Sequence, residues 1–189
     1  MSAESRILVL LERLGALLAR GLREAAARHG LKPVHLLILD YLGRANRYSD
    51  LPIAVAEYLG LTRGTVSQSL ALLEARGLIA SEPDARDGRL KHLRLTAAGH
   101  RLVADSLGRR LAAAFEEARG PEAAALAEGL ERLLAALQRL NGQRAFGLCR
   151  GCRHFRREPG GGRCGLTGEP LSEEDSARLC REWSPPTAA

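Results

Sequence analysis

The feature that most constrains this fold is a pair of short helical segments that meet at a glycine. The first, residues 52–59, has proline in its first turn, is expected to be capped by Ser49 or Asp50, and ends at Gly60. The second, residues 62–76, begins with threonine, a good N-cap, and repeats apolar residues at helical spacing. Two short helices joined by such a turn predict a helix-turn-helix. The expected buried residues of the second helix are Val66, Leu70 and Leu73.

A β-hairpin is predicted directly after these two helices. Residues 78–81 and 90–95 are strand-like, and residues 82–89 between them are rich in proline, aspartate and glycine. A helix-turn-helix followed by a hairpin of this kind predicts a winged arrangement.

Further amphipathic helices are predicted on both sides of the pair. Residues 5–28 repeat apolar side chains every three or four positions, and residues 34–44 follow a proline and are mostly apolar. Residues 96–140 are interrupted at Gly120-Pro121 and predict two helices. Their apolar side chains exceed the needs of one small core, so we expect packing against residues 7–22 of a second copy, with an intrachain bundle as the alternative. These side chains are Leu107, Leu111, Phe115, Leu126, Leu130, Leu133, Leu134 and Leu137.

The predicted fold is therefore mainly α-helical with a small β-hairpin wing. An N-terminal dimerisation helix is expected in residues 1–32, a winged helix-turn-helix in residues 33–98, and C-terminal dimerisation helices in residues 99–141. Residues 142–189 are rich in glycine, arginine and cysteine without sustained periodicity. They predict a short, irregular, metal-binding tail that needs a cross-link to be ordered.

The order of these elements resembles that of the MarR family of transcriptional regulators. The resemblance rests on four segments in the right order and spacing: residues 59–67 (LGLTRGTVS), 73–79 (LEARGLI), 87–89 (DGR) and 93–99 (LRLTAAG). It implies a homodimer that binds a palindromic operator in double-stranded DNA as a repressor. It also implies a small-molecule effector. Nothing in the sequence marks a pocket for one, and His35 and Tyr41, which could line it, are better interpreted as packed residues.

The start of the helix at 62–76 is predicted to contact the DNA bases. Arg63, Thr65, Ser67 and Gln68 face outward when the apolar positions face inward, so they can reach base edges in the major groove. Arg63 could pair with guanine and Gln68 with adenine, whereas Thr62, Thr65 and Ser67 are expected to hold phosphates. The alternative is that these are ordinary solvated helix residues.

The hairpin carries the second predicted DNA contact. Arg86 and Arg89 flank Asp87, and the resemblance implies that Arg89 enters the minor groove while Asp87 orients it. Family members often have a basic residue where this sequence has Ser81, and we expect Lys91 or Arg94 to compensate.

The cysteines are confined to the tail, at Cys149, Cys152, Cys164 and Cys180. The first two form a C-x-x-C pair, and four thiolates favour metal binding over disulfides in a reducing compartment. The spacing resembles the cluster-binding segment of high-potential iron–sulfur proteins, which implies a [4Fe-4S] cluster shielded by aromatic residues. A structural zinc ion is the alternative. We hypothesise that this site senses redox state or iron.

Aromatic and polar neighbours complete the predicted cysteine site. Phe155 and Trp183 are expected to shield a cluster from water, and His154 to point outward or to bond a sulfur.

Composition narrows the remaining classes of function. A net charge of +6 and a pI near 9.7 suit a polyanionic partner. Charged residues break every apolar stretch and the N-terminus has no signal-peptide features, so we expect a cytoplasmic protein without a membrane partner. No nucleophile–base pair, phosphate loop or acid–base carboxylate pair is evident, which argues against an enzyme. An electron-transfer protein on a helical dimer scaffold is the remaining alternative, but it leaves the arginine constellations unused.

Overall fold

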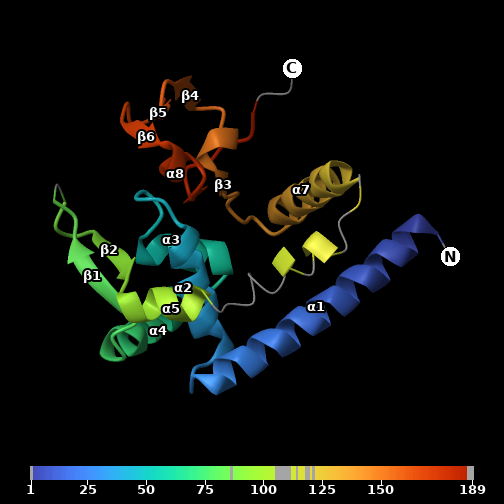
Figure 1. Ribbon diagram of the computed structural model, residues 1–189, viewed down its shortest axis with the longest axis horizontal. Coiled ribbons are helices and arrows are strands. Elements are labelled where there is room, and N and C mark those ends of the chain that lie inside the picture. The colour runs from blue at the N-terminus through green and yellow to red at the C-terminus, as the bar shows by residue number, and fades with distance from the viewer. Residues whose placement is uncertain are drawn as a thin grey trace.

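A small helical core carries a β-hairpin, one long projecting helix and a cysteine-rich tail (Figure 1). The computed structural model describes residues 2–85, 87–104, 112–113, 115–117, 120 and 122–186. Four residues that the sequence singles out, Arg86, Leu107, Leu111 and Pro121, lie outside the described residues, as does part of the predicted helical segment 96–140.

Helices form over the predicted segments. Thr62 accepts a hydrogen bond from the backbone N–H of Thr65 at 3.2 Å and so begins the second helix of the predicted pair, while Gly60, with φ of 64°, ends the first. The predicted helix-turn-helix is therefore confirmed at the turn between its two helices. The helices are α1 (Ala3–Arg28), α2 (Pro33–Arg44), α3 (Pro52–Leu59), α4 (Arg63–Ala75), α5 (Ala97–Ala104) and α7 (Ala123–Leu140).

The predicted cap of α3 is wrong. Leu51 is the N-cap residue and makes no side-chain cap bond. Ser49 instead donates its hydroxyl to the Asn46 side chain at 2.7 Å, and the Asp50 carboxylate lies against His92. Both side chains are buried, and each also has a partner distant in sequence, Arg181 for Ser49 and His92 for Asp50, so local capping chemistry is overridden here.

The core lies where α2, α3 and α4 meet under the hairpin. Val66, Leu70 and Leu73 are buried as predicted. At Gly99, a Cβ atom would lie 2.2 Å from the carbonyl oxygen of Leu78, so α5 can cross the base of the hairpin this closely only with glycine at that position. The largest fully buried apolar side chains are Tyr41, Ile38, Leu39, Leu73, Val55 and Val66.

The hairpin is a two-stranded antiparallel wing. Strand β1 (Ile79–Pro83) pairs with β2 (Lys91–Leu95) in a register that sets Ile79 opposite Leu95. Strand β2 is hydrogen-bonded to the connector between α2 and α3, because the N–H of Leu93 donates to the carbonyl oxygen of Asp50 at 2.7 Å. Figure 1 shows the wing projecting away from the helices on the left.

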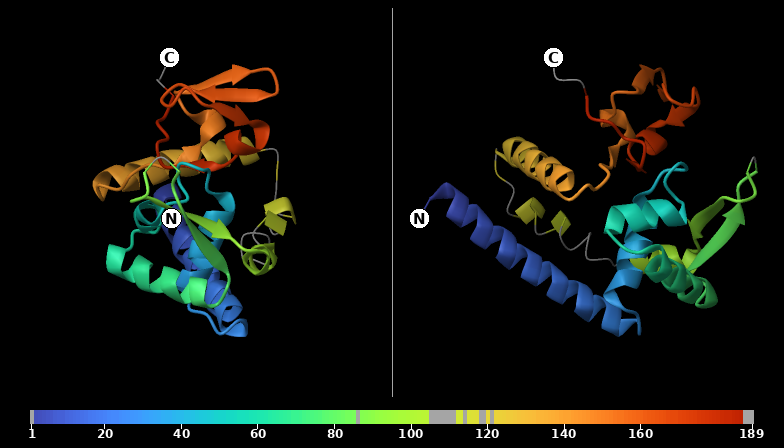
Figure 2. Two further views of the ribbon diagram at one scale, coloured as in Figure 1. Left: turned by 90° about the vertical axis from the view of Figure 1, so that its left-hand side faces the viewer. Right: turned by 180° about the vertical axis from the view of Figure 1, so that it is seen from behind.

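The predicted dimerisation helices are only slightly engaged by the core. In α1, Ala25 and Ala26 at the C-terminal end are the buried residues, and the rest of the helix projects away from the body, as Figure 1 and the right-hand view of Figure 2 show. Every residue of α7 is described and none is buried. Both helices expose rows of leucine. No helix among the described residues combines the length and the apolar character needed to cross a membrane.

The tail is more regular than the sequence predicts. Its three-stranded antiparallel sheet has the order β4-β5-β6, and β3 pairs antiparallel with β7. A Cβ at Gly162 would lie 2.3 Å from the Phe155 ring, so the glycine content that hides the sheet in the sequence also permits its packing. The tail elements are β3 (Gly147–Leu148), the 3-10 turn η1 (Cys149–Gly151), β4 (Phe155–Glu158), β5 (Gly161–Cys164), β6 (Pro170–Ser172), α8 (Glu173–Ser176) and β7 (Leu179–Cys180).

Candidate nucleic-acid interface and cysteine site

The first two turns of α4 present the polar face that the sequence predicts. The side of α4 that carries Val66 is buried, which turns the polar residues between the apolar positions outward. The exposed residues include Thr62, Arg63, Thr65, Ser67 and Gln68. An exposed helix N-terminus of this kind offers both backbone N–H groups and side-chain donors to a polyanion.

A cleft separates this face from the wing. Its volume is about 480 Å³, and cationic side chains from both walls line it, Arg63 from α4 and Lys91 from β2. Ser81, where a basic residue is common in the MarR family, lines the same cleft and donates its hydroxyl to the Glu74 carboxylate. The structure thus brings Lys91 to the cleft that Ser81 also lines.

The wing tip holds an arginine in a fixed orientation. Arg89 donates from Nε and Nη2 to the two carboxylate oxygens of Asp87 at 3.0 and 3.2 Å, and its backbone N–H also donates to Asp87. These bonds lower the pKa of Asp87 below its usual value, so it remains an anion at neutral pH. The Arg89 side chain is 91% exposed and therefore available to a groove.

A relay of carboxylates and one histidine, which the sequence does not predict, supports the wing. Asp84 accepts from the backbone N–H of Asp87 at 2.8 Å and lies 2.9 Å from Nε2 of His92. Nδ1 of His92 lies 2.5 Å from the buried carboxylate of Asp50, which Arg94 also approaches at 3.5 Å. Nothing in the spacing of these residues links position 50 to position 92.

The electrostatics of the relay favour a charged histidine. Hydrogen bonds to Asp50 and then to Asp84 raise the pKa of His92. Burial raises the pKa of Asp50, although His92 and Arg94 oppose this shift. An imidazolium is a donor at both ring nitrogens, so it can bond two carboxylates at once.

We expect the wing to be held less firmly as pH rises. Because the folded pKa of His92 is raised, its stabilisation is complete below the usual value of 6.5 and is lost as pH passes through the raised value. Losing one such bond costs about 1 kcal/mol, which lowers Tm by about 2–4 °C in a chain of this size. The measurement is Tm between about pH 6 and about pH 8.5 for the parent and for His92→Gln, whose amide does not titrate. Equal falls in the two proteins would contradict the assignment.

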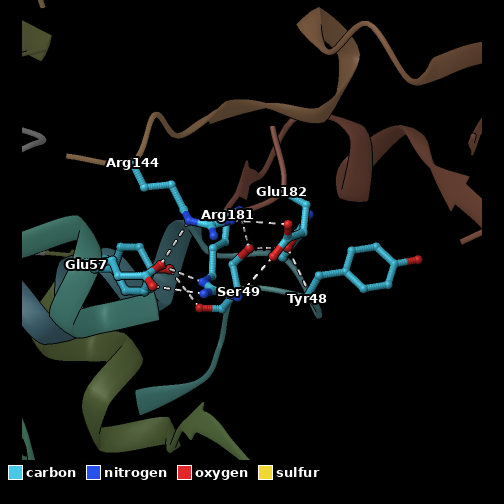
Figure 3. Close-up of polar contacts among 8 residues, drawn as sticks. Tyr48, Ser49, Glu57, Arg144, Arg181 and Glu182 are labelled. Atoms are coloured by element: carbon cyan, nitrogen blue, oxygen red, sulfur yellow. Dashed lines mark hydrogen bonds and ion pairs between the residues drawn. The ribbon is translucent and has the colours of Figure 1, made fainter. Parts of the chain in front are cut away.

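The tail docks directly on the helix-turn-helix. Arg181 forms a two-pronged pair with Glu57 of α3 at 2.6 and 2.9 Å, and its backbone N–H donates to the Ser49 hydroxyl at 2.8 Å (Figure 3). Arg144 lies between Glu57 and Glu182, 3.4 and 3.2 Å from them. The bond from Arg181 is the largest cause of the lowered pKa of Glu57. None of these contacts is signalled by local sequence.

The four cysteines share one pocket. Cys149, Cys152, Cys164 and Cys180 are free thiols and all four line a cavity of about 60 Å³. Cys149 and Cys180 are buried, whereas the other two are half-buried. The cavity exceeds the 10–15 Å³ that one water molecule needs. The structure therefore brings together the predicted ligand set, which is spread over 32 positions of the tail.

Polar hydrogens surround the sulfur atoms. The Asn46 side-chain amide donates to Cys149 Sγ at 3.1 Å, and the backbone N–H of Ser184 donates to Cys152 Sγ at 3.4 Å. A hydrogen bond between the side chains of Cys149 and Cys180 raises the pKa of Cys149 and lowers that of Cys180. Donors of this kind stabilise thiolates, the form that binds metals.

Aromatic and polar side chains surround the cysteine pocket. Among the described residues, no three His, Cys, Asp or Glu side chains converge closely enough to hold one metal ion. Phe155 and Trp183 pack against the cysteines, as predicted from the sequence, and His154 also lines the pocket. The buried indole N–H of Trp183 has no acceptor in the described part of the chain. The four thiols therefore share one space with an aromatic lining.

Together, α2–α5 and the wing define a winged helix-turn-helix protein. Residues 29–90 match the model of the MarR family, and comparison with curated proteins finds no match. The described fold is thus a winged helix, and residues 29–90 are similar to the MarR family. His35 and Tyr41 are both buried in its core, as the interpretation of them as packed residues predicts.

Solved structures agree with this class. FabT of Streptococcus pneumoniae in complex with DNA is 26% identical, with a TM-score of 0.57, over 72% of this chain and 99% of that one. The transcription regulator MarR of Oenococcus oeni is 20% identical, with a TM-score of 0.57, over 69% and 97%. The MepR–DNA complex of S. aureus is 22% identical, with a TM-score of 0.55, over 69% and 96%. The last two likenesses concern the fold alone.

Proposed function

We propose that this chain is a DNA-binding transcriptional regulator that acts as a homodimer on a palindromic operator, in the manner of a repressor. The observation that carries the proposal is the outward polar face of α4 beside a wing arginine locked to Asp87. FabT and MepR, whose structures contain DNA, support it by their likeness in fold. An enzymatic role is disfavoured, because the family matched by residues 29–90 consists of transcription regulators.

The two predicted contacts divide the work of recognition. Arg63 and Gln68 lie where an inserted recognition helix meets base edges, and the threonine and serine hydroxyls of α4 suit phosphates. Arg89 suits the minor groove, where narrow A·T-rich segments attract arginine. Lys91, from the opposite wall of the cleft, adds a phosphate contact.

We expect Arg63→Ala to weaken binding to a selected operator by about 1–3 kcal/mol and to relax specificity at one base position in each half-site. Arg89→Ala should weaken binding more evenly across sequences and reduce the salt slope by about 1 per arginine lost. The measurements are Kd values at several salt concentrations on duplexes selected from a random pool. Arg157→Ala, which removes an exposed arginine of β4 in the tail, is the matched control. Parental affinity in both variants would refute the assignment.

The proposal extends to a [4Fe-4S] cluster held by Cys149, Cys152, Cys164 and Cys180, through which the regulator senses redox state or iron. Such a cluster would supply a reversible one-electron centre whose loss releases four thiolates. The support is the shared cavity and the N–H donors to sulfur. A structural zinc ion would order the tail but would not respond to modest oxidation.

A further inference from the structure

Asn46 is a buried side chain that joins the cysteine site to the DNA-binding domain. It is 2% exposed and lies in the connector between α2 and α3. Its Nδ2 donates to Cys149 Sγ at 3.1 Å. Its Oδ1 accepts from the Ser49 hydroxyl at 2.7 Å and from the backbone N–H of Tyr48 at 3.1 Å. The two ends of one amide thus bond the cysteine site and the connector.

The same connector holds the wing. Asp50 follows Ser49 directly, its carbonyl oxygen accepts from Leu93 at 2.7 Å, and its carboxylate bonds His92 at 2.5 Å. His92 continues to Asp84, which accepts from the backbone of Asp87, the partner of Arg89. A continuous series of hydrogen bonds and covalent bonds therefore joins a cysteine sulfur to the wing-tip arginine.

Strand β7, which carries Cys180, contacts the same connector. Arg181, the residue after Cys180, donates its backbone N–H to the Ser49 hydroxyl at 2.8 Å (Figure 3). The backbone N–H of Asn46 donates to the carbonyl oxygen of Leu179 at 2.9 Å. The residues on both sides of Cys180 are thus fixed to residues 46–49, which shortens the path between the sulfur atoms and the wing.

We propose that Asn46 is a positioning residue. Whether the Cys149 sulfur accepts a hydrogen bond from Asn46 determines how firmly the α2–α3 connector is bonded to the wing. A buried amide must keep its hydrogen bonds, because an unpaired polar group away from water is costly. If the sulfur ceases to accept, Asn46 must turn to another acceptor, and Ser49 and Tyr48 lose theirs. The connector then relaxes, and with it the bonds from Asp50 to Leu93 and His92.

This inference adds to the proposed function a path from the cysteine site to the wing. Only the role of that path in regulation rests on the proposed function. The tail directly follows α7, so the shortest path along the chain would run through that helix. The contacts described above run instead through the α2–α3 connector, directly before α3, the first helix of the helix-turn-helix. The coupling itself requires neither metal nor DNA, so it can be tested without them.

The test uses the full-length, reduced, metal-free protein and measures amide hydrogen exchange at Leu93 and Asp87. Asn46→Asp removes the donor to sulfur but keeps Oδ1 for Ser49 and Tyr48. Cys149→Ala removes the acceptor. Each variant should speed exchange at both amides by about tenfold, the effect of one net hydrogen bond. The double variant should be no faster than either single variant, because both break one interaction.

Two controls separate this coupling from general loosening of the tail. Cys152→Ala removes a sulfur that accepts from Ser184 within the tail, so it should speed exchange at Ser184 and leave Leu93 unchanged. Glu57→Gln weakens the docking pair with Arg181 without touching Asn46 and should also leave Leu93 unchanged.

Every outcome bears on the proposal. Unchanged exchange at Leu93 in Asn46→Asp, additive effects in the double variant, or equal effects of Glu57→Gln would each overturn it. If the parent prepared without oxygen bound no iron, accelerated exchange at Leu93 in the variants would uphold the coupling, and the absence of iron would refute the cluster. The same acceleration without any change in operator affinity would uphold the coupling while refuting the proposed sensing function.

Discussion

The double variant Leu14→Glu/Leu134→Glu should be a folded monomer that has lost at least about 100-fold in operator affinity, because one monomer meets one half-site. Leu14 in α1 is 52% exposed and Leu134 in α7 is 53% exposed, within rows of similarly exposed leucines. Full burial of one leucine contributes about 1.5–3 kcal/mol, and a dimer contains four of these side chains. Replacing them with carboxylates removes that term and adds buried charge.

Sedimentation velocity at micromolar concentration measures the association state, and circular dichroism measures folding. Leu166→Glu makes the same chemical change at a 54% exposed tail position and should leave the dimer intact in sedimentation. A double variant that still sediments as a dimer would show that α1 and α7 pack within one chain instead.

Loss of Cys180 should abolish cofactor binding almost completely. Protein prepared without oxygen is expected to be brown and to carry about four iron atoms per chain, whereas Cys180→Ser should be nearly colourless, since cubane clusters need four protein ligands. Visible absorption together with iron and sulfide analysis measures this. Ser176→Ala, which removes a nearby hydroxyl that bonds within the tail, is the control. A colourless parent with about one zinc per chain would contradict the cluster.

The sensing role requires a further comparison at one salt concentration. Operator affinity should differ by about tenfold or more between anaerobic holo protein and either air-exposed protein or Cys164→Ser/Cys180→Ser, as allosteric couplings commonly do. Equal affinity in all three would leave the tail as a structural element or as a contact for another protein.

The helices were predictable because their signals are local. Thr62 and Gly60 mark helix ends through their own chemistry, and the three-to-four-residue repeat of α4 determines which residues face outward. The orientation of Arg89 by Asp87 was also accessible, because the two residues are two positions apart. These features required no knowledge of the rest of the chain.

The supporting network was not predictable, because its partners are distant in sequence. Asn46 and Cys149 are 103 positions apart, and Glu57 and Arg181 are 124 apart. Long-range contacts also explain why Ser49 and Asp50 do not cap α3, since their side chains are already engaged by Arg181 and His92. The tail sheet was missed because strands of two to four residues are too short to show a period.

The aromatic contacts of Phe146 bear on how the molecule unfolds. Its ring lies 5.2 Å from that of Tyr58 and 6.3 Å from that of Tyr41, both approximately edge-on, and Leu179 packs against the same core. Residues from the tail thus complete the hydrophobic interior of the winged helix. Melting the tail would expose Tyr58 and Leu179 together. The tail and the winged helix should therefore denature in one cooperative transition. Damage at the cysteines should then lower the stability of the whole protein.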